Sequence, residues 1–213
     1  MNWTKASYRK DVEQRLKEEL RRRGYSFFAK DFSFIRPTGP DPDVTARVSY
    51  QVTTANQPPT VVGIHPSGSI RIGSVAKICE DLFGRSAETA TISAPLGAFT
   101  SANANQSVYR FDWADTAGSA FEKLSSDLDQ FDSFASAIQS VQDLSADRLA
   151  RVPNLRRNFA EGLGETYKYT TPEVAAVIHH LNGDRERAVS ALALARRLGP
   201  EQRAKVADFI DHE

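Results

Sequence analysis

The sequence predicts an α+β protein, with an antiparallel sheet of about five strands packed by an N-terminal helix and followed by an all-helical C-terminal part. The first sign is a change of period at Gly24. Before it, apolar side chains recur every four residues, at Val12, Leu16 and Leu20; after it, Phe28, Phe32 and Phe34 all stand at even positions. A spacing of four is typical of a helix face, and a spacing of two of a strand face. The second sign is the strict apolar–polar alternation from Val44 to Thr53, typical of a strand with one buried face.

Composition limits the class of protein. Of the 213 residues, 40% are hydrophobic and 25% are charged, as in ordinary soluble globular proteins. With 27 basic and 27 acidic residues the formal net charge is zero, so no global field attracts nucleic acid or membrane. Cys79 is the single cysteine, which excludes an intramolecular disulfide. We expect a cytoplasmic protein, since neither a signal peptide nor an apolar run of roughly 20 residues occurs.

The first helix is expected at about Ser7–Arg23, and the first strand at about Tyr25–Ile35. Gly24 suits the left-handed end of a helix, and the basic residues 21–23 complement the negative C-terminal dipole. Residues 37–43 hold three prolines and a glycine, which predict a loop.

Further strands are expected before the next helix. Val44–Val52 is the clearest of them. Val62 and Ile64 mark a short third strand, residues 66–68 (Pro-Ser-Gly) predict a tight turn, and Ile70 and Ile72 begin another strand.

A short helix is expected at Val75–Phe83, where apolar side chains share one face and Gly84 follows. One more strand is expected near Thr91. A stronger strand is expected at Val108–Trp113, with its aromatic side chains on one face.

From Ala117 onward the chain is predicted to be helical, beginning with a stripe of apolar residues from Phe121 to Phe134. Near the C-terminus, Thr171 and Asp184 are expected to cap helices, and Gly199-Pro200 separates the last two. We therefore divide the chain into three parts: a helix-plus-sheet domain with trailing helices (1–150), a linker or irregular connection (151–171), and a helical hairpin or triplet (172–213).

The histidines and the cysteine form no recognisable motif. Neighbouring side chains on a helix point about 100° apart, so His179 and His180 do not grip one ion. Their place near a helix end favours a structural role. Cys79 is expected in the core as a small apolar residue. We expect no metal site, no cofactor and no catalytic residue.

His65 is the more informative histidine, because it lies where a strand enters the predicted turn. Its parity differs from that of Val62 and Ile64, which places it on the polar face. A general base there needs a nucleophile or a second acid–base group nearby. An ordinary turn histidine is the simpler interpretation.

Three arginines extend this polar face. Arg47 and Arg71 have the polar parity of their strands, and Arg110 alternates with Tyr109 and Phe111. If the strands are neighbours, these arginines and His65 line one face that binds an anionic or acidic partner. The alternative is an ordinary solvated sheet face.

Nucleic acid and membrane are not favoured as partners. The cluster Arg21-Arg22-Arg23 ends a helix, and no aromatic–basic module accompanies it. Both glycine-rich nucleotide fingerprints are absent from the sequence.

The first 145 residues follow one order: a helix with a glycine–aromatic end, an aromatic strand, a polar-faced strand, further sheet and then helices. The residues that carry this order are Leu16, Leu20, Gly24-Tyr25, Phe27-Phe28, Val44–Val52 and Phe121–Phe131. The pattern resembles small uncharacterised bacterial domains that look like immunity and toxin-neighbour proteins. The resemblance has no diagnostic motif, implies no catalytic residue, and excludes the helices from about Pro172.

Three functions follow as hypotheses. The first is a non-catalytic bacterial binding protein, such as an immunity-like or inhibitory partner of another protein. The second is a small hydrolase-type enzyme with a site near His65. The third is a structural module of a larger assembly. A deep pocket with converging polar side chains favours the enzyme, and a flat exposed patch favours binding.

Overall fold

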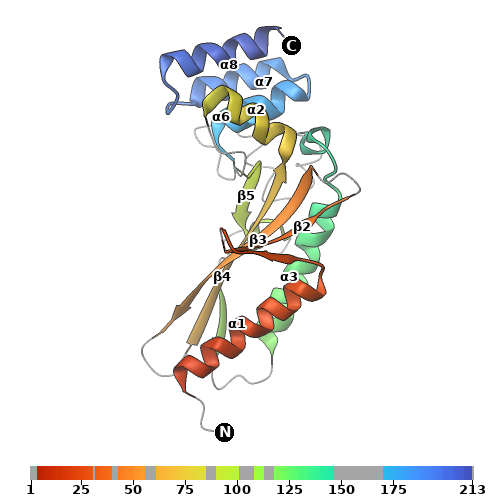
Figure 1. Cartoon of the computed structure of the whole chain (residues 1–213), viewed down its shortest axis with the longest axis vertical. Helices are drawn as coiled ribbons and strands as arrows, with labels where there is room; N and C mark the ends of the chain where they lie inside the picture. The colour runs from red at the N-terminus through yellow and green to blue at the C-terminus, as the bar shows by residue number, and fades with distance from the viewer. Residues whose placement is uncertain are drawn as a thin grey trace.

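The fold is α+β, as predicted (Figure 1). The structure, a computed structural model, describes residues 4–30, 32–39, 43–55, 61–84, 90–100, 108–112, 118–145 and 170–212. An N-terminal helix precedes a six-stranded antiparallel sheet, and several helices follow. The elements are α1 (Lys5–Arg22), β1 (Ser26–Phe28), β2 (Ser33–Pro37), β3 (Val44–Thr54), β4 (Val61–Ile72), α2 (Gly73–Phe83), β5 (Ile92–Pro95), β6 (Tyr109–Asp112), α3 (Ser119–Ser136), α6 (Pro172–Leu181), α7 (Arg185–Leu194) and α8 (Pro200–His212), with 3₁₀ turns η1 (Leu96–Ala98) and η2 (Val141–Leu144).

The strands follow the order β1-β2-β3-β4, and the far edge of β4 is shared by two short strands. β6 pairs with residues 61–64 of β4, and β5 pairs with residues 67–70. Even-numbered residues of β3 and β4 face one side, which we call the inner face, and bury Val48, Ile64 and Ile70. Odd-numbered residues form the outer face, which is mostly polar.

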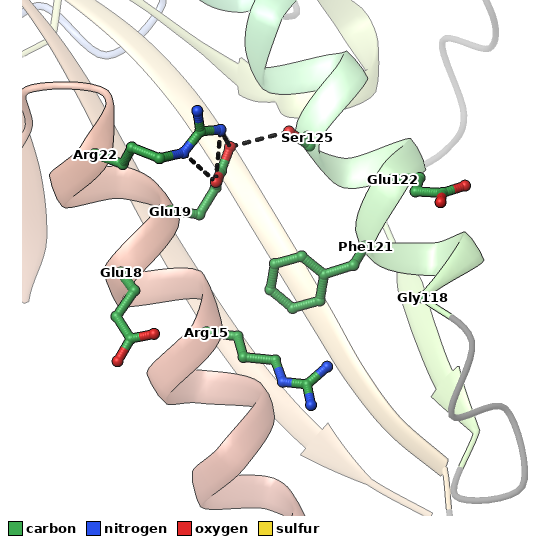
Figure 2. A pocket seen from close by; sticks show the side chains of 8 residues that line it. All are labelled: Arg15, Glu18, Glu19, Arg22, Gly118, Phe121, Glu122 and Ser125. Carbon is green, nitrogen blue, oxygen red and sulfur yellow. Dashed lines mark hydrogen bonds and ion pairs between the residues drawn. The ribbon is translucent and has the colours of Figure 1, made fainter.

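Helices α1 and α3 lie side by side against the inner face (Figure 2). The stripe Val12, Leu16 and Leu20 of α1 is buried, as its period predicts. Phe131 of α3 packs so closely on the sheet that a Cβ atom at Gly68 would lie 2.7 Å from its ring.

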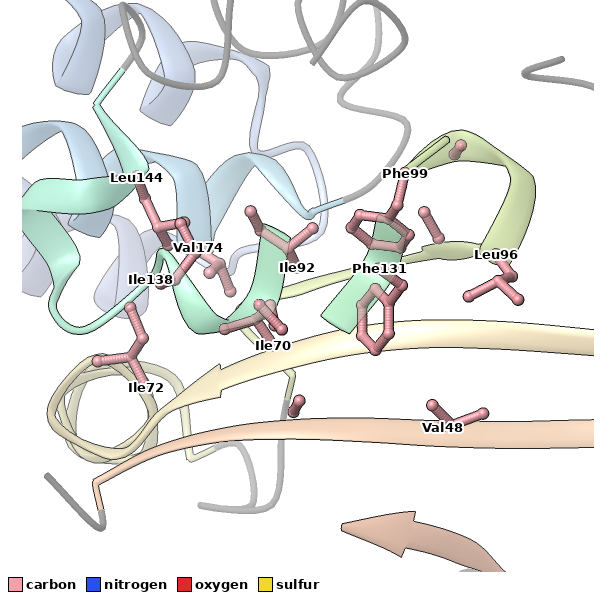
Figure 3. Close-up of a cluster of buried hydrophobic side chains, with 14 of the residues drawn as sticks. Val48, Ile70, Ile72, Ile92, Leu96, Phe99, Phe131, Ile138, Leu144 and Val174 are labelled. Carbon is pink, nitrogen blue, oxygen red and sulfur yellow. The ribbon is translucent and has the colours of Figure 1, made fainter. Parts of the chain in front are cut away.

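One hydrophobic core runs from the sheet into the C-terminal helices (Figure 3). Phe131 meets Phe99 edge-on, with ring centroids 4.9 Å apart. Ile92 of β5 and Val174 of α6 lie in the same cluster, so the C-terminal helices and the sheet share buried apolar surface.

Residues 25–35 form a hairpin of two strands, and the prediction of a single strand there is wrong. Phe28 pairs with Ser33, so the chain reverses direction between these two residues. Paired residues lie on the same face, and Phe34 pairs with Phe27. Phe28, the next residue, therefore lies on the opposite face from Phe34. A parity count assumes an unbroken strand, and it fails once a turn intervenes.

β4 is one continuous strand, so the turn predicted at residues 66–68 is also wrong. The bonds from Ala55 N to Val61 O (2.9 Å) and from Gly73 N to Asp43 O (2.9 Å) show that odd residues of β4 bond to β3. The nitrogen of Pro66 therefore points to the other edge. At that edge β6 pairs with residues 61–64 and β5 with residues 67–70, so Pro66 lies between the two paired segments. Neither β5 nor β6 requires a backbone N–H donor from residue 66.

Helix α2 begins through a long-range contact. Asp43 Oδ2 accepts a hydrogen bond from Ser74 N at 2.8 Å. A Cβ atom on Gly73 would lie 1.9 Å from Asp43 Oδ1, so this close approach requires glycine. The helix ends at Gly84 in the left-handed conformation, as predicted.

The C-terminal helices and α2 form one end of the molecule (Figure 1). Thr171 and Asp184 cap α6 and α7 as predicted, by accepting hydrogen bonds from backbone N–H groups. Gln202 of α8 donates to the carbonyl oxygen of Phe83 at 3.1 Å. Trp113 and residues 151–169 of the predicted connection lie outside the described residues.

Candidate functional site

The outer face carries all four residues of the predicted binding set. In the strand register Arg47 lies opposite Ser69, Arg71 opposite Thr45, His65 opposite Gln51 and Arg110 opposite Gly63. The four side chains therefore share one face, as their parity predicts. Their role in binding stays a prediction.

The register brings only two of the arginines together. Arg47 and Arg71 are diagonal neighbours on adjacent strands, a spacing of roughly 7–8 Å between Cα atoms. Arg110 pairs six residues farther along β4, about 20 Å from the row of Arg47 at 3.3 Å per residue. His65 lies between them. The basic residues thus line the face and do not converge on one point.

Phe32 is turned onto this face. Its backbone has φ 50°, in the left-handed region, and its side chain is 77% exposed. It borders a depression of about 400 Å³, whose lining consists of Phe32, Ser49, Tyr50, Gln51, His65 and Ser67. The sequence predicted Phe32 on one strand face with Phe28 and Phe34. That prediction is wrong, because Phe32 lies in the turn of the hairpin.

His65 forms a hydroxyl–imidazole pair. Its Nε2 lies 3.0 Å from Oγ1 of Thr53 on the neighbouring strand. Gly63 leaves room for the pair, since a Cβ atom there would lie 2.5 Å from that hydroxyl. Within the described part of the chain, no carboxylate hydrogen-bonds to His65. Among the residues that the structure describes, His65 thus has no orienting acid of the kind found in a catalytic triad.

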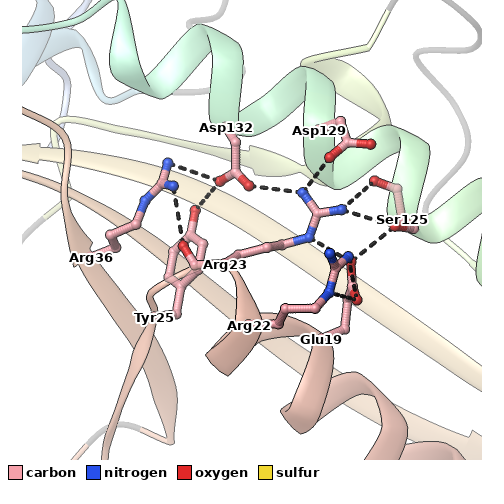
Figure 4. A network of polar contacts seen from close by, with 8 residues as sticks. All are labelled: Glu19, Arg22, Arg23, Tyr25, Arg36, Ser125, Asp129 and Asp132. Carbon is pink, nitrogen blue, oxygen red and sulfur yellow. Dashed lines mark hydrogen bonds and ion pairs between the residues drawn. The ribbon is translucent and has the colours of Figure 1, made fainter.

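A polar network joins α1 to α3 on the inner side of the sheet (Figure 4). Arg23 is 8% exposed and uses its whole guanidinium: Nε bonds to Glu19, Nη1 to Asp129 and Asp132, and Nη2 to Ser125. The sequence interpretation gave the arginine cluster only a helix-dipole role. That account is incomplete for Arg23, which links the two helices.

The network shifts the ionisation of Glu19. Burial alone would raise the pKa of this carboxyl. Hydrogen bonds from Arg22, Arg23 and Ser125 outweigh burial and hold the pKa at about 2. Glu19 is therefore charged at neutral pH and belongs to the scaffold.

A groove of about 450 Å³ also separates α1 from α3, and Phe121 points into it from α3 (Figure 2). Charges of both signs line it, including Arg15, Glu18 and Glu122. This mixture gives no preferred sign of partner, so the groove is the weaker candidate.

The remaining titratable candidates are structural. Cys79 is buried in α2. His179 is 3% exposed, and burial lowers its pKa below the usual 6.5, so its ring is neutral at pH 7. In the described ranges, no three His, Cys, Asp or Glu side chains gather to hold a metal ion. Across the same ranges, every helix is too short or too polar to serve as a membrane span.

Comparison with known proteins finds no match: no protein-family model, curated protein or solved structure is significantly similar to this chain.

Sequence reasoning missed Phe32 and Arg23 for different reasons. Asp31, a residue type favoured in turns, stands in the sequence beside Phe32 and was a usable signal. Arg23 had no such signal. Its burial depends on the acidic face of α3, which lies more than 100 residues away in the chain.

Proposed function

We propose that this chain is a non-catalytic binding protein that docks another protein on its outer sheet face, as an immunity-like or inhibitory partner does. The observation that carries the proposal is Phe32, which is 77% exposed with φ 50° beside the depression at His65. A left-handed conformation costs a non-glycine residue about 1–3 kcal/mol, and exposing an aromatic ring forgoes its burial. Folding gains little from phenylalanine at this position, whereas an aromatic anchor at the centre of an interface contributes strongly to binding.

The charge of the outer face supports an acidic partner. Arg47, Arg71 and Arg110 all lie on it, with His65 between them. Among the outer-face positions of β3 to β6, Asp112 is the one acidic residue. Such a bias steers acidic partners toward the face and repels basic ones.

Photo-cross-linking tests this proposal directly. We would replace Phe32 by the photo-reactive benzoylphenylalanine, irradiate living cells of the native host, and identify the cross-linked protein. The matched control places the same residue at Val189, an apolar side chain of α7 that is 47% exposed. We expect one dominant adduct from position 32 that is absent from position 189 and weakened by Arg47→Ala with Arg71→Ala. Identical adducts from both positions would contradict the proposal.

A hydrolase is the second candidate, and the 3.0 Å contact between Thr53 and His65 is the observation in its favour. Hydrolysis through an enzyme nucleophile needs that nucleophile beside an oriented base, in a site that shields the reacting groups from bulk solvent while admitting one water molecule. Thr53 is exposed on the sheet surface, so bulk water reaches its hydroxyl. Turnover of a panel of p-nitrophenyl esters that is abolished by His65→Ala and by Thr53→Val would favour this alternative.

A further inference from the structure

We infer that the partner docks with an extended, acidic segment that pairs with the open edge of β1 and adds a strand to the sheet. The inference rests on the proposed function and specifies the form in which the partner binds. β1 stands at one end of the strand order within the described sheet.

The hydrogen-bond register shows which backbone groups of β1 point outward. Thr38 N donates to Val44 O at 3.1 Å, so even-numbered residues of β2 bond to β3. Odd-numbered residues of β2 therefore bond to β1, which pairs Ser33 with Phe28 and Ile35 with Ser26. The N–H and C=O groups of Phe27 consequently point away from the sheet, where an added strand can use both.

The exposed ring of Phe27 suits an added strand at this edge. Phe27 lies on the inner face, is 47% exposed and packs against Phe34 with ring centroids 5.2 Å apart. Phe32 lies over the outer face. Successive side chains of a strand alternate between faces, so every second side chain of an added strand lies beside Phe27 on the inner face, whereas Phe32 leans toward β3 and β4. Edge strands are usually protected by charge or proline, and Ser26–Phe28 contains neither.

The charge around β1 and the small area of its edge favour an acidic segment of a partner over a second copy of this chain. Arg21 is exposed in the last turn of α1, and Lys30 is exposed in the turn after β1, whereas Arg22 is paired with Glu19. Two copies paired through β1 would bring these basic groups together. Three residues per copy also bury far less than the roughly 1,200 Å² of a stable dimer. A short segment with carboxylates between apolar residues opposes this positive charge and needs no large interface, because main-chain hydrogen bonds supply affinity in strand addition.

The test uses peptides selected from a phage library of random twelve-residue sequences against the wild-type protein. Phe27→Pro removes the outward N–H without removing a bond of the β1–β2 ladder, whereas Phe27→Ala keeps the N–H and removes only the ring. We expect enriched peptides that alternate apolar and acidic residues. We expect affinity to fall about tenfold in Phe27→Ala and at least tenfold further in Phe27→Pro.

Hydrogen exchange of the wild-type protein supplies the second measurement, independent of any folding defect in the variants. The Phe27 amide should exchange at least ten times more slowly with a saturating peptide. Equal affinities of Phe27→Ala and Phe27→Pro, no enriched peptide, unchanged exchange at Phe27, or a homodimer that Phe27→Pro dissolves would each overturn the inference. If the adduct at position 32 persists in Phe27→Pro, the proposed function stands and the edge pairing falls.

Discussion

Asp132 of α3 binds Arg23 at the end of α1, with 2.9 Å between Oδ2 and Nη1. The other oxygen of Asp132 accepts from the hydroxyl of Tyr25 at 2.7 Å and lies 3.0 Å from Arg36 Nη2. One carboxylate therefore ties the helix, the start of the hairpin and α3 together. This contact fastens the β1–β2 hairpin, which carries Phe27 and Phe32, to α1 and α3.

Replacing Asp132 by Asn should destabilise the fold by about 3 kcal/mol, because it removes the charge that two buried guanidinium groups face. Asp129→Asn is the matched control. Asp129 also bonds to Arg23 Nη1, at 2.6 Å, but its side chain is 70% exposed against 15% for Asp132. The control should cost at most about 1 kcal/mol. Urea unfolding of both variants measures the difference, and equal losses would contradict the account of the network.

Glu19 should make stability depend on pH in the acid range. Its folded-state pKa of about 2 lies below the ordinary 4.5, so its contribution is complete above pH 4.5 and is lost as pH falls toward 2. The difference in unfolding free energy between wild type and Glu19→Gln should therefore be largest near neutral pH and shrink below pH 4.5. A difference that stays constant from pH 7 to pH 2.5 would show that the negative charge of Glu19 does not stabilise the fold.

Tyr109 should make folding stability depend on pH in the alkaline range, where stability falls as pH rises. Burial, followed by the hydrogen bond that Tyr109 donates to Asp127, raises its pKa well above 10. The protonated hydroxyl contributes fully to the free energy of unfolding below pH 10, and this contribution is lost as pH rises above 10. Tyr109→Phe should cost about 1.5–3 kcal/mol at pH 7, since Asp127 is 4% exposed and loses this donor. The variant should also lose less stability than wild type between pH 9 and pH 11, measured by chemical unfolding.

Gly73→Ala should destabilise the protein by roughly 1–3 kcal/mol, because its Cβ atom would overlap Asp43, whose carboxylate caps α2. Gly39→Ala is the control, since its nearest neighbour, Gln139, lies at an ordinary 3.6 Å. In the double variant Asp43→Ala with Gly73→Ala the costs should not add, because the clash and the cap share one carboxylate. Strict additivity in thermal unfolding would argue against the overlap.

The elements that the sequence predicted correctly are those with an uninterrupted period. α1, β3 and α3 each repeat their apolar residues at one spacing, and α6 and α7 carry capping residues at their starts. The β1–β2 hairpin was mispredicted because the single turn signal, Asp31, stands between apolar residues of regular parity. The continuous β4 was mispredicted because a proline inside a strand goes against the local rule. Pro66 fits its strand only because its nitrogen meets the gap between β5 and β6.

The candidate site was predictable only in part. Parity alone placed Arg47, Arg71, Arg110 and His65 on one face, since parity follows from the strand backbone. It did not reveal that Arg110 is distant from Arg47, because that distance depends on where β6 pairs along β4. Phe32 depends on a single left-handed backbone angle, which leaves no periodic trace in the sequence.

Phe32→Asn separates folding from binding at this site. Asparagine tolerates the left-handed conformation better than phenylalanine does, and the ring that it replaces is 77% exposed. The unfolding free energy should therefore stay the same or rise by up to about 1 kcal/mol, while the captured partner binds at least tenfold more weakly. Urea unfolding and binding titrations measure the two effects on the same sample. A variant that loses stability by more than about 1 kcal/mol would make Phe32 a residue of the fold, because strain at φ 50° would then be outweighed by packing.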